Sequence, residues 1–233
     1  MSTATGTTTG LVDRLYAAFD SPRRQMLLMV AIVVVMAVLP MLMGRYATTI
    51  MTNALLYVVL ALGLNIVVGY AGLLDLGYAA FFAVGAYSIG ILTVQFDWNF
   101  WLAIPPALVA ACMAGVIIGG PTLRLRSDYL AIVTLGFGEI VRFSARNLEI
   151  TGRASGLSNI PEPNFFGYVI NSYVDFYYVF LLLAVIAVIA SHRLYHSRLG
   201  RAWLYVRHDE DAAEAMGINR VRVKLAAYVT GSV

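Results

Sequence analysis

Residues 26–43 read MLLMVAIVVVMAVLPMLM, eighteen consecutive positions without a charged side chain. A helix needs about 20 apolar residues to cross the hydrocarbon core of a bilayer. The stretch is longer than the apolar core of a signal peptide, and no small-x-small cleavage site follows it. We therefore predict a first membrane span here and an all-α membrane protein as the fold class.

Charge is sparse in the middle of the chain and concentrated at its ends. Hydrophobic residues make up 60% of the 233 positions, well above the share in a soluble domain. Residues 26–190 contain 13 of the 29 charged side chains, and the two short flanks contain the other 16. A soluble enzyme would need charge over its whole surface, and a disordered chain would contain much less Leu, Val and Ile, so both classes are excluded.

Five further apolar stretches have a length suited to membrane spans. They lie at 47–68, 76–96, 100–120, 129–145 and 170–190. Together with 26–43 they predict a polytopic helical bundle of six spans in a lipid bilayer. The apolar run 225–233 is too short to cross, so we expect the start of a seventh span and a copy that is incomplete at its C-terminus.

Basic residues predict the orientation, because Lys and Arg in short loops collect on the cytoplasmic side. With a cytoplasmic N-terminus, 12 of the 16 basic residues face the cytoplasm, the exceptions being Arg45, Arg142, Arg146 and Arg153. The predicted organisation is a cytoplasmic tail with an interfacial helix (1–25), the bundle (26–190), a cytoplasmic loop (191–224) and the start of a further span (225–233).

A glycine-rich stretch interrupts the apolar pattern at residues 69–77, which read GYAGLLDLG. Broken backbone at membrane depth survives only where it lines a cavity or is buried in protein, so a translocation path could pass here. The alternative is an ordinary cytoplasmic turn with a solvated Asp75. The path candidates in and beside this broken-helix region are Asn65, Gly72, Asp75 and Tyr78.

Glu139 is a further path candidate, because it is a carboxylate ten residues into an apolar segment. Arg142 follows three residues later on the same helical face, so the two side chains could simply pair. Small residues form stripes at helical spacing, which predicts close helix packing. These stripes are Ala79, Ala83, Ala86 and Gly90 in one span, and Gly115 and Gly119 in the next.

The cytoplasmic segment 200–224, GRAWLYVRHDEDAAEAMGINRVRVK, contains the signals of one short helix. Asp209 is a good N-cap, Glu210 and Asp211 favour the helix start, and Gly217 suits a left-handed stop. An apolar face is expected from Ala212, Ala213 and Met216. Such a helix suits a groove on a soluble partner, whereas a solvated connector would need no apolar stripe.

Several chemistries have no motif. Lys224 is the only lysine and no phosphate-binding loop precedes it, so ATP energy must come from another chain. No nucleophile motif frames a serine, and the His192 and His196 pair lacks the glutamate of a zinc protease, so we expect neither an enzyme nor a metal site nor a cofactor. The arginines form no continuous basic face, which excludes nucleic acid as a partner.

Three blocks give the chain a family resemblance: LNIVVGYAGLLDLGYAAFFAVGAY (64–87), LRLRSDYLAIVTLGFGEIVRF (123–143) and the segment 200–224. They resemble the membrane permease subunits of bacterial ABC importers for branched-chain amino acids. The coupling loop of that superfamily reads Glu-Ala-Ala, three residues, then Gly. Asp211, Ala212, Ala213 and Gly217 occupy these places, with Asp in place of Glu.

The resemblance implies a permease that couples to ATPases through residues 209–217 in the bacterial inner membrane. It also implies three kinds of partner: a second permease subunit, cytoplasmic ATP-binding subunits and an external substrate-binding protein facing residues 146–169. The alternative function is an ion-coupled secondary transporter of small polar solutes that uses Asp75, Glu139 or Asp175.

Overall fold

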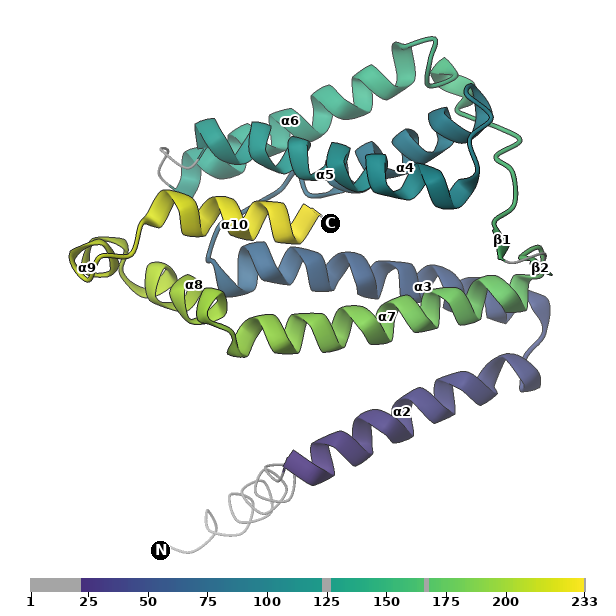
Figure 1. Cartoon of the computed structure of the whole chain (residues 1–233), viewed down its shortest axis with the longest axis horizontal. Helices are drawn as coiled ribbons and strands as arrows, with labels where there is room; N and C mark the ends of the chain where they lie inside the picture. Colours follow the sequence, from purple (N-terminus) through teal and green to yellow (C-terminus); the bar gives the residue numbers. More distant parts are fainter. Residues whose placement is uncertain (1–21, 123–126, 166–167, 233) are drawn as a thin grey trace, which may run out of the picture.

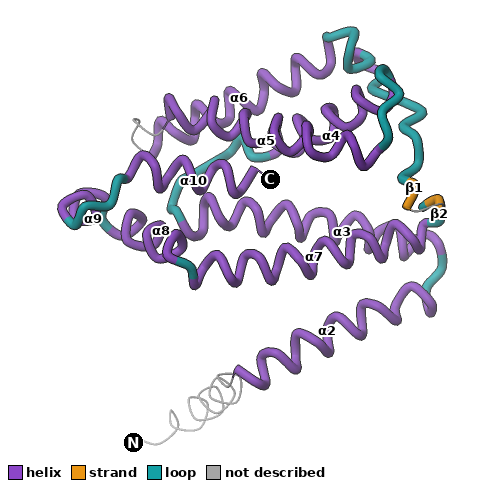
Figure 2. Tube along the Cα trace, viewed as in Figure 1, coloured by secondary structure: helices purple, strands orange, loops and turns teal. Residues whose placement is uncertain are grey.

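The computed structural model describes residues 22–122, 127–165 and 168–232. The tail and interfacial helix predicted for residues 1–25 therefore lie almost wholly outside the described residues. Helices dominate the described chain, and one small two-stranded ribbon joins two of them (Figure 2). The elements are α2 (Pro22–Leu42), α3 (Arg45–Leu64), the π-helix η1 (Asn65–Tyr70), α4 (Ala79–Val94), α5 (Phe100–Thr122), α6 (Ser127–Asn147), the 3-10 turn η2 (Arg153–Ser155), β1 (Asn164–Phe165), β2 (Tyr168–Val169), α7 (Tyr173–His196), α8 (Arg198–His208), α9 (Glu210–Ala215) and α10 (Arg220–Ser232).

Helices α3 and α7 lie side by side in the middle of the molecule, with α2 on one side and the layer of α4, α5 and α6 on the other (Figure 1). Leu55 of α3 packs with Tyr177, Leu181 and Ala184 of α7 in a buried cluster. The ribbon β1–β2 and the connection after α6 lie at one end of these helices, and α8 and α9 lie at the other (Figure 1). The bundle thus has two distinct ends, one with the ribbon and one with α8 and α9.

Helix α2 is peripheral, and it is tied to α7 by two tyrosine hydroxyls. Pro40 has no amide hydrogen to donate to the Met36 carbonyl, which lies four residues earlier in the helix. The Tyr177 hydroxyl donates to that carbonyl at 2.6 Å, and the Tyr178 hydroxyl donates to the Ala37 carbonyl at 3.0 Å. The interhelical bond therefore satisfies a carbonyl that proline leaves without its helical donor.

Three helices of the described chain are long and apolar enough to cross a membrane: Arg45–Tyr70, Phe100–Gly120 and Tyr173–His196. Shorter apolar helices cover Leu27–Leu42 and Ala79–Val94. The all-α membrane fold is thus confirmed, whereas the number of six spans stays a prediction. Each predicted stretch nevertheless contains a helix, because hydropathy and helix boundaries both follow from local sequence.

The interruption predicted near 69–77 has a defined form. After α3 the chain widens into η1, and residues 71–78 then run without regular helix to the start of α4. Gly72 has a φ of +71°, which a residue with a side chain rarely adopts. At 16 residues α4 is about 24 Å long, which is less than the roughly 30 Å of a bilayer's hydrocarbon core.

The main core joins the interruption to the C-terminal helix. Val67 of η1, Leu73, Phe81 of α4, Trp203 of α8 and Tyr228 of α10 belong to one buried cluster. Helix α10 starts at Arg220, five residues before the predicted start, and α7 extends six residues beyond the predicted span end, to His196. Hydropathy ends at the first charged residues, whereas helical hydrogen bonding continues past them.

Candidate functional site

The short helix predicted in the segment 200–224 is present as α9. Oδ1 of Asp209 accepts from the amides of Asp211 and Ala212, each at 3.0 Å, which is the predicted N-cap. Gly217 has a φ of +85°, and its amide donates to the Glu214 carbonyl. The helix therefore has the two ends that its sequence predicts.

The apolar face predicted for α9 is divided. Ala213 is buried, whereas Ala212 is exposed and Met216 is 74% exposed. Position 213 lies about 100° round the helix from position 212 and about 60° from position 216, so the three positions fit the one stripe that the sequence predicts. Only Ala213, at one edge of this stripe, is buried, and Met216, the C-cap of α9, is the large apolar side chain that faces outward.

Ion pairs attach α9 to the first turns of α10. Nζ of Lys224 lies 2.5 Å from Oε1 of Glu210, and the Lys224 side chain is only 6% exposed while that of Glu210 is 47% exposed. Nε of Arg220 lies 3.3 Å from Oε2 of Glu214. Because a buried ammonium is costly without a partner, Glu210 is needed to hold Lys224 in place.

Helix α8 connects the region of α9 and α10 to the interruption. Nε1 of the fully buried Trp203 donates to the Val223 carbonyl of α10 at 2.8 Å. On the next turn, the Arg207 guanidinium donates to the Gly69 carbonyl at the end of η1. A Cβ at Gly72 would lie 2.7 Å from Cγ of Arg207, so the arginine stem also packs against the broken backbone.

Asp75 is buried, with 5% of its surface exposed, so the predicted alternative of a solvated turn is wrong. Its Oδ1 accepts from the Gly77 amide at 2.8 Å, and the neighbouring Leu76 amide donates to Thr134 of α6 at 3.1 Å. The Oδ2 atom has no hydrogen-bond partner among the described residues. The segment 71–78 is thus held against α6, and this contact removes the carboxylate from water.

The other candidates of this region lie around the end of α3. The Tyr78 hydroxyl donates to the Gly231 carbonyl of α10 at 2.6 Å. This hydroxyl lies against Gly63, where a Cβ would collide with it. Asn65 starts η1 and is exposed, and its side-chain oxygen lies over Gly69. Tyr78 and Gly72 therefore contact the C-terminal helices, whereas Asn65 contributes to the surface.

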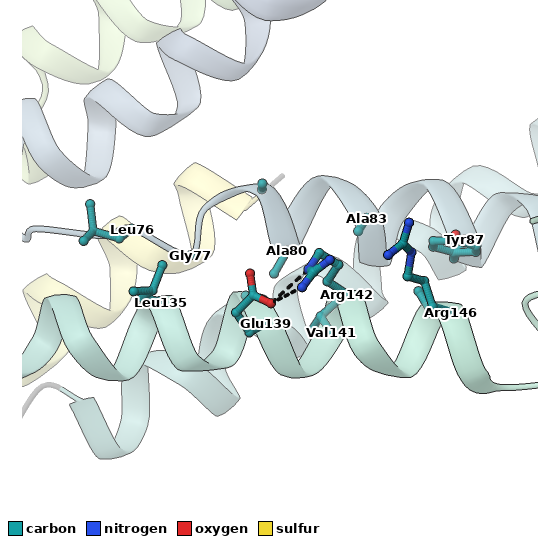
Figure 3. A pocket seen from close by; sticks show the side chains of 13 residues that line it. Leu76, Gly77, Ala80, Ala83, Tyr87, Leu135, Glu139, Val141, Arg142 and Arg146 are labelled. Atoms are coloured by element: carbon teal, nitrogen blue, oxygen red, sulfur yellow. Dashed lines mark hydrogen bonds and ion pairs between the residues drawn. The ribbon is translucent and has the colours of Figure 1, made fainter. Parts of the chain in front are cut away.

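Glu139 lies in an open cavity of about 360 Å³ between α4 and α6, which we call the α4–α6 cavity (Figure 3). Both Nε and Nη2 of Arg142 donate to Oε2 of Glu139, at 2.9 and 2.6 Å, so the predicted pairing is present. The two side chains remain 58% and 57% exposed. The residues that line the cavity include Gly77, Ala83, Tyr87, Glu139, Arg142 and Arg146.

The two stripes of small residues occupy different surroundings. Ala79 and Ala83 line the α4–α6 cavity, Ala86 is exposed, and a Cβ at Gly90 would lie 2.9 Å from Leu157. In α5, a Cβ at Gly115 would lie 3.2 Å from the Tyr228 carbonyl, and one at Gly119 would lie 3.0 Å from Leu225. The second stripe is therefore a close contact of α5 with α10, whereas the first faces the cavity and the connection after α6.

Asp175 occupies the start of α7. Its carboxylate accepts from the Ser172 amide, and the Ser172 side chain accepts from the Val174 amide, which together form a capping box.

The sequence did not predict the contacts of Arg207 and Thr134, because their partners lie 138 and 58 residues away along the chain. For the ion pair of Lys224 the sequence offered one indication, because Lys224 is the only lysine of the chain.

Comparison with known proteins adds evolutionary evidence to this geometry. Residues 46–233 match the family described as branched-chain amino acid transport system / permease component. The chain belongs to this family. The matched residues contain the elements from α3 to α10, and they therefore include the interruption, the α4–α6 cavity and α9.

Relatives in this permease family include two named high-affinity branched-chain amino acid transport system permease protein LivM. Those from Salmonella typhimurium (strain LT2) and Escherichia coli (strain K12) are each 42% identical over 92% of this chain and 56% of their own length. A probable branched-chain amino acid transport permease protein LivM from Methanocaldococcus jannaschii is 26% identical over 76% of this chain and 61% of its own. The chain thus spans about half the length of the first two. No solved structure matches it.

Proposed function

We propose that this chain is a permease subunit of an ATP-driven ABC importer for branched-chain or related amino acids. In this proposal it forms the translocation path and an attached ATPase supplies the energy. The observation that supports it most directly is the linkage of α9 to the broken segment 71–78 within a chain of this family. A helix that only connected two spans would need neither the buried Lys224 nor the Arg207 contact.

The partners in this proposal follow from the two ends of the molecule. Cytoplasmic ATP-binding subunits would receive the exposed Met216 and the acidic surface of α9. An external substrate-binding protein would dock on the connection after α6, and a second permease subunit would complete the path. The N-terminus would then be cytoplasmic, and the protein would lie in the bacterial inner membrane with six spans.

Motion of α9 would reach the path by two routes. The Lys224–Glu210 pair would transmit it to α10, whose Gly231 carbonyl accepts from Tyr78. Helix α8 would transmit it to the Gly69 carbonyl through Arg207. The first route ends at Tyr78 and the second beside Gly72, at the two ends of the segment 71–78, which has few helical hydrogen bonds to break and can therefore change its shape.

The Gly217→Val variant tests the coupling role of α9. No atom lies within 4 Å of a Cβ at Gly217, so the variant acts only through its positive φ. Backbone strain of about 1–3 kcal/mol would turn α9 relative to α10. ATP-driven leucine uptake into vesicles that contain the complete transporter is expected to fall about tenfold or more, while ATP hydrolysis continues.

Gly217→Asn is the matched control, because asparagine tolerates this backbone region, and it should retain most uptake. Unchanged uptake in Gly217→Val would count against coupling through α9. The alternative, an ion-coupled transporter, draws on the buried Asp75 and its unpartnered oxygen. Leucine uptake that follows an ion gradient in vesicles depleted of ATP would favour that alternative.

The Arg207→Ala variant tests the route through α8. It removes a charge-assisted hydrogen bond to the Gly69 carbonyl, which is worth about 1.5–3 kcal/mol. Uptake is expected to fall about tenfold, with ATP hydrolysis retained. Arg201→Ala is the control in the same helix, because among the described residues the Arg201 side chain donates only to the nearby His196 carbonyl. Equal loss of uptake in the two variants would contradict a specific role for Arg207.

A further inference from the structure

The α4–α6 cavity contains charged groups that the fold does not use for packing. Glu139, Arg142 and Arg146 extend from successive turns of α6 toward α4, where Ala83 and Tyr87 form the opposite wall (Figure 3). Positions three and four residues apart on a helix are neighbours about 5–6 Å apart. One carboxylate and two guanidinium groups therefore lie along one side of the cavity, with a net charge of +1.

These groups keep free bonding capacity. Both hydrogen bonds from Arg142 end on Oε2 of Glu139, and Oε1 of that carboxylate accepts none from the described residues. The Arg146 side chain is exposed and has no hydrogen bond or ion pair with the described part of the chain. An exposed oxygen anion thus lies beside a guanidinium with unused donors, which are complementary to an ammonium and a carboxylate respectively.

The position of the charges gives a purely structural role little benefit. Glu139 lies 12 residues into α6, about 18 Å along a helix that is about 30 Å long. In the proposed six-span arrangement α6 crosses the membrane, and ionisable groups of a span face protein or water and mark ligand pathways. An i,i+3 pair adds only about 0.2–0.5 kcal/mol to a helix, so helix stabilisation alone explains little of why three charged side chains line one cavity.

We propose that the α4–α6 cavity is a binding site for the zwitterionic head group of an aliphatic amino acid. The ligand carboxylate would bind Arg142 and Arg146, its ammonium group would bind Oε1 of Glu139, and its side chain would contact Leu135 and Ala83. A cavity of about 360 Å³ is within the range of small-molecule sites. This inference rests on the proposed function, because it assigns the place in the path where the amino acid pauses.

The test is protection of an introduced cysteine in the complete transporter with its partner subunits. Cys112 is first replaced by serine, and Ala83→Cys then places a thiol in the cavity wall for reaction with N-ethylmaleimide. L-leucine at about ten times its Kd is expected to slow the reaction about tenfold by mass action. Leucinamide, which lacks the carboxylate, and 4-methylpentanoate, which lacks the ammonium group, are expected to protect at least about tenfold less well.

Variants of the charged groups complete the test. Glu139→Gln and Arg146→Gln should each weaken protection by leucine about tenfold or more. Glu149→Gln is the matched control, because Glu149 pairs with Arg153 outside the cavity, and it should leave protection unchanged. Full protection in Glu139→Gln or Arg146→Gln, or equal protection by 4-methylpentanoate, would overturn the proposed site.

Leucine uptake by the unmodified transporter separates this site from the proposed function. ATP-driven uptake without protection of Ala83→Cys would overturn the site and leave the function intact. Absence of ATP-driven uptake would overturn the proposed function and the site that rests on it. Uptake together with charge-dependent protection is the result that both proposals require.

Discussion

Replacement of Gly77 by alanine is expected to detach the segment 71–78 from α6 and to destabilise the protein by about 3 kcal/mol or more. A Cβ at Gly77 would lie 2.0 Å from the Thr134 carbonyl oxygen, and backbone atoms on both sides leave no flexible side chain to yield. Gly138 approaches the same point, since its Cβ would lie 3.3 Å from the Cα of Gly77. The segment 71–78 and α6 therefore approach so closely that neither Gly77 nor Gly138 has free space for a larger side chain.

Two measurements check this expectation: the amount of folded protein recovered from membranes and the midpoint of its thermal unfolding. Gly85→Ala is the matched control in the neighbouring helix, because nothing lies within 4 Å of a Cβ at Gly85. Alanine favours an α-helix over glycine by about 0.5–1 kcal/mol, so the control should be neutral or slightly more stable. Similar behaviour of the two variants would refute the close contact.

The second large effect is expected at the pair that joins α9 to α10. Glu210→Gln leaves the ammonium of Lys224 buried without a counter-charge, which should cost about 3 kcal/mol, at the lower end for a buried pair because Glu210 is half exposed. For a chain of this size the midpoint of thermal unfolding should fall by about 6–12 °C. The purified protein in detergent is suitable for this measurement.

The double variant Glu210→Gln with Lys224→Met removes both charges and should recover most of the lost stability. Glu214→Gln serves as the control, because its partner Arg220 is partly exposed and the pair contributes less than about 1 kcal/mol. If Glu210→Gln unfolds at the temperature of the original protein, Lys224 does not depend on this partner.

Features that depend on local sequence were predictable. The N-cap at Asp209 and the left-handed Gly217 follow from residue types that satisfy or permit a particular backbone geometry within a few positions. The predicted spans contain helices for the same reason, because apolar length is a property of one segment. The pairing of Glu139 with Arg142 also involves only one helical turn.

Features that depend on distant segments were not predictable. Burial of Asp75 results from its contact with α6, where Thr134 lies 58 residues from Leu76. The bond of Arg207 to Gly69 crosses 138 positions, and no periodicity in either segment indicates the other. The outward Met216 and inward Ala213 likewise depend on which side of α9 meets α10, which the helix sequence alone does not specify.

Pro40 and Tyr177 show how such distant positions constrain each other. The proline leaves the Met36 carbonyl without its helical donor, and the tyrosine hydroxyl supplies one from another helix. A homologue that replaces the proline regains a backbone amide that can donate to the Met36 carbonyl, so the tyrosine hydroxyl is no longer needed there. A homologue that loses the hydroxyl first leaves this carbonyl without either donor. The order of inherited changes at these two positions is therefore constrained, with the proline replaced before the tyrosine.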